Sequence, residues 1–160
     1  AATGAVGVVR RDPMAMKPFC GLNFGDYWAH WLKVGSQLTH APKIFNVNWF
    51  RKGSDGKFIW PGFSDNLRVL AWALKRCSGT VGAQASAIGH IPHAQDLELS
   101  GLDLTAEAVN TLLRVEPSAW QTEVEEIAAF LAEYGTRTPH ALQLELAKAR
   151  AALGTLAQAA

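Results

Sequence analysis

In the stretch NWFRKGSDGKFIWPGFSDN at residues 48–66, aromatic residues alternate with residues typical of turns. Ser54-Asp55-Gly56 predicts a tight turn, because glycine readily adopts the positive φ that such a reversal requires. We therefore expect a hairpin-like loop with Phe50 and Phe58 close together at its base. Pro61-Gly62 then redirects the chain and should bring Phe63 to the same neighbourhood. The aromatic residues of this stretch are Trp49, Phe50, Phe58, Trp60 and Phe63.

The loop lies between a predicted strand and a predicted helix. Residues 43–50 are rich in β-branched and aromatic side chains, which favours a strand. Residues 65–77 place apolar residues at helical spacing, and Ser64 or Asp65 can cap the first turn of that helix. The apolar positions of the predicted helix are Leu67, Leu70, Ala71 and Leu74.

Several aromatic rings in a surface loop suit a flat heterocyclic ligand. Stacking of a base on an aromatic side chain contributes roughly 1–3 kcal/mol whichever base it is. Discrimination between bases then needs hydrogen bonds to the base edge, which Asn66 can supply as donor and acceptor. The competing interpretation is that Phe50, Phe58 and Phe63 are core residues. Burying so many rings in a loop is difficult, because loops normally lie at the surface.

The loop motifs also resemble a known family. PKIF at 42–45, VNWFRK at 47–52, DGKFIWPGF at 55–63 and NLRVL at 66–70 are similar to the guanine-binding stretch of GTP-dependent phosphoenolpyruvate carboxykinase. The resemblance continues upstream through RRDPMAMKPF (10–19), NFGDY (23–27) and HWL (30–32), and downstream through IGHIP (88–92) and DLELSGL (96–102). It covers most of the chain, fades in the last helices and corresponds to the C-terminal end of that enzyme.

The resemblance implies a guanine site. In the family the base lies between phenylalanine rings matching Phe50, Phe58 and Phe63, and the stretch matching 63–66 contacts its edge. Asn66 matches the family residue directly. Ser64 and Asp65 replace the usual Gly and Glu, so the resemblance implies backbone contacts there and leaves side-chain contacts undecided. The candidate nucleotide-binding residues are Trp49, Phe50, Phe58, Phe63, Ser64, Asp65 and Asn66.

The family also implies a fold and a reaction. The expected fold is α/β, the C-terminal part of a nucleotide-binding lobe that ends in a helical tail. We expect residues 1–9 to be the trailing end of a mobile lid loop, 10–95 the guanine-binding part and 96–160 the helical tail. The whole enzyme would convert oxaloacetate and GTP into phosphoenolpyruvate, GDP and CO2, using Mn2+.

The catalytic groups are expected elsewhere. In the family the catalytic residues, the phosphate loop and the manganese ligands lie N-terminal to this segment, so none is assigned here and the segment alone should be inactive. The sequence itself has no Gly-x-x-x-x-Gly-Lys-Ser/Thr motif. His90 and His93 lack a third ligand, and Pro92 argues against a helix that would align them on a metal.

Composition narrows the remaining possibilities. A chain of 160 residues with 49% hydrophobic and 18% charged residues is typical of a globular domain. The net charge of +1 favours neither nucleic acid nor a membrane surface as partner. No run reaches the ~20 apolar residues of a membrane span. Cys20 and Cys77 show no pairing pattern and indicate two buried free thiols in a reducing cytoplasm. The whole enzyme is expected to be a monomer of which this chain, starting at Ala1 without a Met, is a part.

Two other classes of function stay open. The aromatic loop could belong to a non-enzymatic module that grips a peptide or single-stranded RNA, although the near-zero net charge argues against RNA. Alternatively, three helices predicted at 105–113, 117–134 and 139–156 could form a docking platform, with the aromatic loop as core. Binding of GTP compared with ATP and with a short RNA would separate these possibilities.

Overall fold

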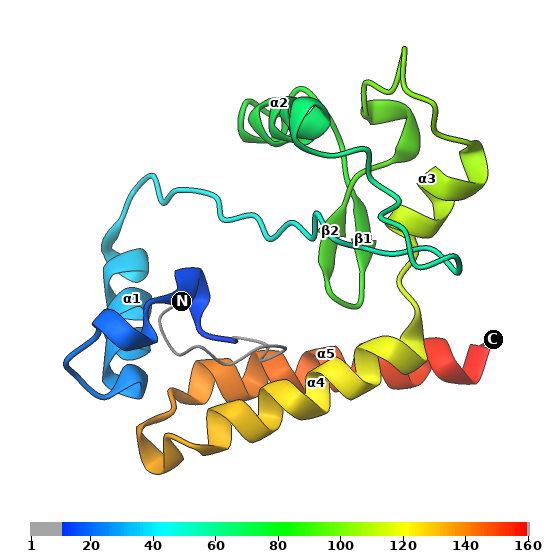
Figure 1. Cartoon of the computed structure of the whole chain (residues 1–160). Helices are drawn as coiled ribbons and strands as arrows, with labels where there is room; N and C mark the ends of the chain where they lie inside the picture. Colours follow the sequence, from blue (N-terminus) through cyan, green and yellow to red (C-terminus); the bar gives the residue numbers. More distant parts are fainter. Residues whose placement is uncertain (1–10, 160) are drawn as a thin grey trace. The chain divides into compact units, whose positions relative to one another are not determined.

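The computed structural model describes residues 11–159 (Figure 1). The lid segment expected at 1–9 therefore lies outside the described residues, as does a short strand expected at Val6–Val9. The chain divides into two compact units. The first, here called the helical unit, comprises the residues up to Ala41 and those from Glu116 onward; the second, the loop unit, is Pro42–Val115.

The helical unit is built from three helices, and the last two are those that the sequence predicts at 117–134 and 139–156. Helix α1 is Phe24–Gln37, α4 is Pro117–Ala132 and α5 is His140–Ala159. The Asn23 side chain accepts a hydrogen bond from the Gly25 N–H at 2.9 Å, which satisfies a free donor of the first turn of α1. Short 3-10 turns complete the unit: η1 (Pro13–Ala15), η2 (Lys17–Phe19) and η5 (Gly135–Arg137).

An aromatic cluster fastens α1 to the end of α4. The Trp28 ring lies edge-on to Phe24, Phe130 and Tyr134, with ring centroids 4.9–5.8 Å apart. Edge-on pairs at this spacing add to the stabilisation that burial of the rings provides. Trp28 is buried within this unit. Trp28 therefore finds its packing partners within the described residues of this unit.

Helices α4 and α5 run antiparallel and side by side (Figure 1). Leu153 of α5 is fully buried and Val124 of α4 is nearly so. The predicted narrow apolar stripe of the Ala-rich last helix thus finds its partner in α4. A bidentate ion pair joins the helices at their surface, where the Arg150 Nε and Nη2 atoms donate to Glu125 at 2.9 and 2.6 Å.

The loop unit mixes short helices with a small sheet. Its elements are η3 (Phe63–Asp65), α2 (Asn66–Cys77), β1 (Gln84–Ser86), β2 (Gly89–Ile91), η4 (Ala94–Asp96) and α3 (Ala106–Leu113). β1 and β2 pair antiparallel, with Gln84 opposite Ile91. Each strand is only three residues long, and β1 (Gln-Ala-Ser) lacks the β-branched and aromatic residues that are enriched in strands. The described residues thus form a mixed fold of helices and a small sheet.

The strand predicted at 43–50 is absent. Residues 41–48 have no regular secondary structure, and no described segment pairs with them. A strand needs a neighbour for its backbone N–H and C=O groups, so a β-rich composition alone is insufficient. The segment is instead attached to α2 through side chains. The Phe45 ring lies edge-on to Trp72 at 6.1 Å, and the Lys43 ammonium donates to the Arg76 carbonyl at 3.0 Å.

Helix α2 buries a different face from the one the sequence predicts. Trp72 is buried, whereas Leu67, Leu70 and Leu74 are exposed. The periodicity identified the helix correctly but not its covered side, because both sides of α2 carry apolar residues. None of the helices within residues 11–159 is both long and apolar enough to cross a membrane.

A candidate nucleotide-binding loop

The aromatic loop has the predicted hairpin-like geometry. Lys52 and Phe58 form an isolated antiparallel bridge, and the Ile59 N–H donates to the Arg51 carbonyl at 2.9 Å. Gly56 has φ +77°, the left-handed conformation that favours glycine in a tight turn. The loop is also fastened to α3, since the Arg51 Nη1 atom donates to the carbonyls of Leu112 and Arg114 at 3.2 and 3.0 Å.

The predicted pairing of Phe50 with Phe58 is confirmed. Their ring centroids lie 5.8 Å apart with an interplanar angle of 60°. Both rings nevertheless stay largely exposed, at 69% for Phe50 and 56% for Phe58. The Lys52 ammonium lies 5.5 Å from the centroid of Phe58 and covers that ring in part.

Phe63 is the most exposed of the three rings, at 94%. It opens the 3-10 turn η3 and makes no ring contact with another aromatic residue in the described part of the chain. Its placement beside Phe50 and Phe58 thus stays a prediction. Phenylalanine is among the residues most often buried, so three phenyl rings this exposed in one unit indicate an apolar surface available to a ligand.

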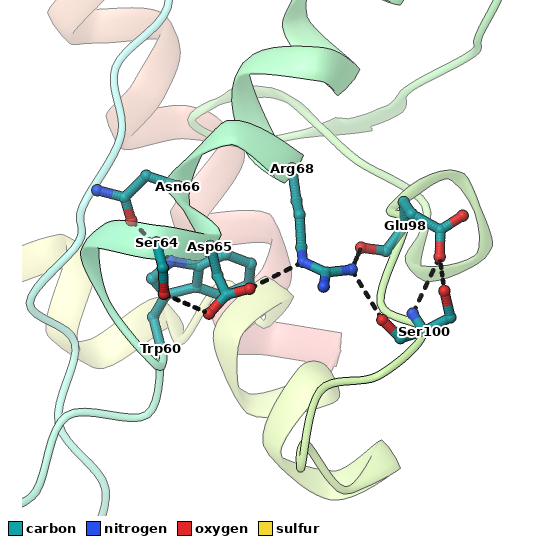
Figure 2. Close-up of polar contacts among 7 residues, drawn as sticks. All are labelled: Trp60, Ser64, Asp65, Asn66, Arg68, Glu98 and Ser100. Atoms are coloured by element: carbon teal, nitrogen blue, oxygen red, sulfur yellow. Dashed lines mark hydrogen bonds and ion pairs between the residues drawn. The ribbon is translucent and has the colours of Figure 1, made fainter.

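The two tryptophans of the loop behave differently. Trp49 is half-buried, whereas Trp60 is only 7% exposed. The expectation that Trp60 belongs to the surface cluster was wrong, because its indole packs beneath the start of α2 and finds a polar partner there. The indole N–H donates to Oδ1 of Asn66 at 2.9 Å (Figure 2).

Asp65 is held by its neighbours rather than capping α2. Its Oδ2 accepts a hydrogen bond from Ser64 Oγ at 3.1 Å, and its Oδ1 accepts one from Arg68 Nε at 3.0 Å (Figure 2). Asp65 itself has helical φ and ψ, and its side chain accepts no hydrogen bond from a backbone N–H of the first turn of α2. The predicted side-chain cap is therefore wrong, and both carboxylate oxygens of Asp65 already have partners.

Arg68 joins the start of α2 to the segment 98–100. Its Nη1 atom donates to the carbonyls of Glu98 and Ser100 at 2.8 and 3.0 Å (Figure 2). The Glu98 carboxylate accepts hydrogen bonds from the Ser100 hydroxyl and from its N–H, which lower the pKa of Glu98 below its ordinary value of 4.5. From the sequence, Arg68 has no assigned role beyond its place in the motif at 66–70. Its i, i+3 spacing from Asp65 is nevertheless typical of an ion pair on a helix.

The described residues of the loop offer groups that a ligand could contact. Among residues 11–159, no three His, Cys, Asp or Glu side chains are grouped so that they could hold a metal ion. The Mn2+ that the resemblance implies therefore does not fit the residues described, and no reaction step is assigned to a metal ligand of this chain. The loop offers exposed rings and the free amide hydrogens of Asn66.

Comparison with known proteins decides the family. The family model described as the phosphoenolpyruvate carboxykinase C-terminal P-loop domain matches residues 1–152. The chain belongs to the GTP-dependent phosphoenolpyruvate carboxykinase family. It is 47% identical over 156 residues to the phosphoenolpyruvate carboxykinase [GTP] of Paenarthrobacter aurescens, a match that covers 96% of this chain and 26% of the relative.

Relatives from other organisms give similar matches to the same family. Phosphoenolpyruvate carboxykinase [GTP] of Thermoplasma volcanium is 45% identical over 151 residues, covering 94% of this chain and 25% of that protein. The enzyme of Treponema pallidum strain Nichols is 46% identical over 150 residues, covering 91% and 24%. The chain thus spans about a quarter of the length of the carboxykinases that it matches.

Proposed function

We propose that this chain supplies the guanine-binding part of a GTP-dependent phosphoenolpyruvate carboxykinase. The whole enzyme would convert oxaloacetate and GTP into phosphoenolpyruvate, GDP and CO2. The observation that carries the proposal is the exposure of three phenylalanine rings in one unit, on a loop held in place by backbone hydrogen bonds and by Arg51. Family membership supports a guanine nucleotide as the ligand of that loop.

Each candidate residue has a part in this proposal. Phe50, Phe58 and Phe63 provide stacking surface for the base, and Trp49 adds a half-buried wall beside Phe50. Asn66 contacts the base edge with its side chain. Ser64 and Asp65 contribute backbone groups only, because their side chains are already bonded to each other and, for Asp65, to Arg68.

The remaining parts of the active site would come from other residues of the enzyme. We assign no catalytic residue to this chain, and the groups that bind the phosphates, Mn2+ and oxaloacetate would lie outside it. Residues 1–9 would end a mobile lid, 10–95 would form the guanine-binding part and 96–160 the helical tail. Cys20 and Cys77 are both free, which agrees with a cytoplasmic enzyme, proposed to be a monomer. Their expected burial was wrong, because Cys20 is half-buried and Cys77 is exposed.

Nucleotide selectivity tests the proposal directly. We would measure equilibrium binding of GTP, ATP and a short single-stranded RNA to a full-length carboxykinase that carries this chain. Tighter binding of GTP than of ATP, with negligible RNA binding, is expected. Equal binding of all three would instead indicate the non-enzymatic aromatic-loop module, and binding of none would indicate that the rings are not a ligand site.

A matched pair of variants links that binding to the loop. Phe58→Ala removes a stacking face, whereas Phe19→Ala removes a similarly exposed ring from η2 of the helical unit. GTP binding should weaken in the first variant and stay unchanged in the second. Equal losses in both would assign the effect to general destabilisation rather than to stacking.

A further inference from the structure

The buried indole of Trp60 has a single polar atom, and that atom contacts Asn66. An indole N–H is a donor only, so the atom of the Asn66 amide that faces it must be the carbonyl oxygen. The distance from Nε1 to Oδ1 is 2.9 Å, and Trp60 is 7% exposed. The orientation of the Asn66 amide is therefore set by Trp60.

We propose that Trp60 is a positioning residue for base selection, which fixes the Asn66 amide so that its NH2 group faces the ligand and admits purines with an oxygen at position 6. The inference rests on the proposed guanine-binding function. It adds to that function a residue which contacts no ligand and acts through another side chain.

The geometry leaves the NH2 group free for a ligand. Within the described part of the chain Nδ2 has no hydrogen-bond partner, and it points away from Trp60 (Figure 2). The backbone of Asn66 is held as well, because its N–H donates to the Phe63 carbonyl at the turn into α2. Asn66 is half-buried.

The chemistry of the two purines makes this orientation selective. Guanine presents acceptors at O6 and N7, whereas adenine presents an amino donor at position 6. An asparagine free to rotate its amide could serve either base, offering NH2 to guanine or C=O to adenine. With its oxygen engaged by Trp60, Asn66 offers a donor, which complements O6 and opposes the adenine amino group.

Rotating the amide to suit adenine would carry a penalty. The Trp60 N–H would then face the NH2 group and would be left buried without an acceptor, which costs more than the loss of an exposed hydrogen bond. Sites that hold a polar group in place for one substrate reject the mismatched analogue strongly for this reason.

The test uses Trp60→Phe in a full-length carboxykinase that carries this chain, with Trp72→Phe as control. Trp72 is also a buried tryptophan of the loop unit, but its Nε1 has no hydrogen-bond partner among the residues described. We would measure kcat/KM for GTP, ITP and ATP, and the melting temperature of each variant. ITP keeps the oxygen at position 6 and lacks the 2-amino group.

Trp60→Phe should lower the ratio of kcat/KM for GTP to kcat/KM for ATP about five- to tenfold, because the variant loses the effect of one neutral hydrogen bond. The GTP/ITP ratio should stay unchanged, because both bases carry the oxygen that Asn66 contacts. Trp72→Phe should leave both ratios unchanged even if it lowers the melting temperature equally. A folded Trp60→Phe enzyme with unaltered GTP/ATP preference would overturn the proposal.

A double variant tests whether Trp60 acts through Asn66. In an Asn66→Ala background, adding Trp60→Phe should change the GTP/ATP ratio no further, because the two residues act as one unit. A further independent change would contradict the inference. Phe58→Ala distinguishes failure of the Trp60 inference from failure of the proposed guanine-binding function. It should weaken GTP and ATP binding alike, and no effect on either would reject the proposed function itself.

A structure of the GTP complex keeps the proposal testable if Trp60→Phe does not fold. Trp60 Nε1 should still lie within hydrogen-bond distance of Asn66 Oδ1, with Nδ2 directed at O6 of the base. An Asn66 side chain that has left Trp60, or that presents its oxygen to the base, would refute it.

Discussion

At the scale of single residues, exposure separates the phenylalanines from the tryptophans of the aromatic loop. Phe50, Phe58 and Phe63 stay open to solvent, while Trp60 is enclosed and hydrogen-bonded. Composition gave no basis for this division, because all four side chains are large and apolar and alternate along one short stretch. What distinguishes Trp60 is its N–H, which needs an acceptor when buried, and Asn66 provides one.

The first prediction concerns the exposed rings. Phe63→Ala or Phe58→Ala in a full-length carboxykinase should raise the KM for GTP far more than the KM for oxaloacetate. Each lost stacking face is expected to cost about 1–3 kcal/mol, or roughly five- to 150-fold in affinity. Steady-state kinetics with each substrate varied in turn provides the measurement. A GTP KM equal to that of the unmodified enzyme, in a folded variant, would rule out stacking.

The second prediction concerns the close approach of α1 to η5. A Cβ atom on Gly25 would lie 2.5 Å from the Arg137 carbonyl oxygen, so Gly25→Ala must displace buried backbone. We expect it to destabilise the protein by about 1–3 kcal/mol, the usual cost of overpacking.

Gly35→Ala is the matched control for that change. Gly35 belongs to the same helix, and a Cβ there meets nothing within 4 Å. This substitution should leave stability unchanged or raise it by up to about 1 kcal/mol, because alanine favours helix. Chemical unfolding compares the two variants, and equal effects would mean that α1 and η5 do not pack as described.

At the scale of elements, helices were predictable and the isolated strand was not. Helices α3, α4 and α5 begin within one residue of the positions predicted for them, because the sequence signals of a helix start act within one turn of chain. Residues 43–50 depend on a distant partner that local sequence does not contain. The same limit applies to α2, whose position was predicted but whose buried face was not.

The third prediction is that the free energy of unfolding depends on pH through Glu98, in the segment 98–100 that Arg68 contacts. Hydrogen bonds from Ser100 stabilise the charged form of Glu98 and depress its pKa in the folded state. The unfolded chain therefore takes up the proton first, and the stabilising contribution is complete above pH 4.5 and is lost as pH falls through the lowered pKa.

Glu98→Gln replaces the titrating carboxylate with a neutral amide, and the unmodified protein is compared with this variant. Unfolding free energies of the two proteins should differ most near neutral pH and converge as pH falls below 4.5. A stability difference that is constant across this range would show that the Glu98 charge does not contribute. Ser100→Ala should resemble Glu98→Gln, since it removes the hydroxyl that donates to the carboxylate.

At the scale of the whole molecule, the loop unit leaves an apolar surface uncovered. The exposed side chains of α2 are Leu67, Leu70 and Leu74, and Ile44 in the preceding segment is exposed as well. Contiguous apolar surface of this kind is uncommon on soluble monomers and favours association.

The fourth prediction concerns the 160-residue chain alone. It should associate at micromolar concentration, and Leu70→Lys together with Leu74→Lys should reduce that association by introducing charge. It should also show no carboxykinase turnover, because the groups proposed to bind the phosphates and metal are not in it. Light scattering and a coupled assay provide the measurements. Chelator-sensitive turnover by the isolated chain would place catalytic groups within it.

The helical unit is discontinuous, since Pro42–Val115 separates its two stretches of chain. The loop unit is therefore an insertion within a helical scaffold. Closing a longer loop costs only about 0.6 kcal/mol for each doubling of its length, so such an insertion can vary greatly in size while the scaffold still folds. On the proposed guanine-binding function, base preference resides in this insertion. Replacing Pro42–Val115 with the loop unit of an enzyme of another nucleotide specificity should then change the base preference and leave the aromatic cluster around Trp28 unchanged.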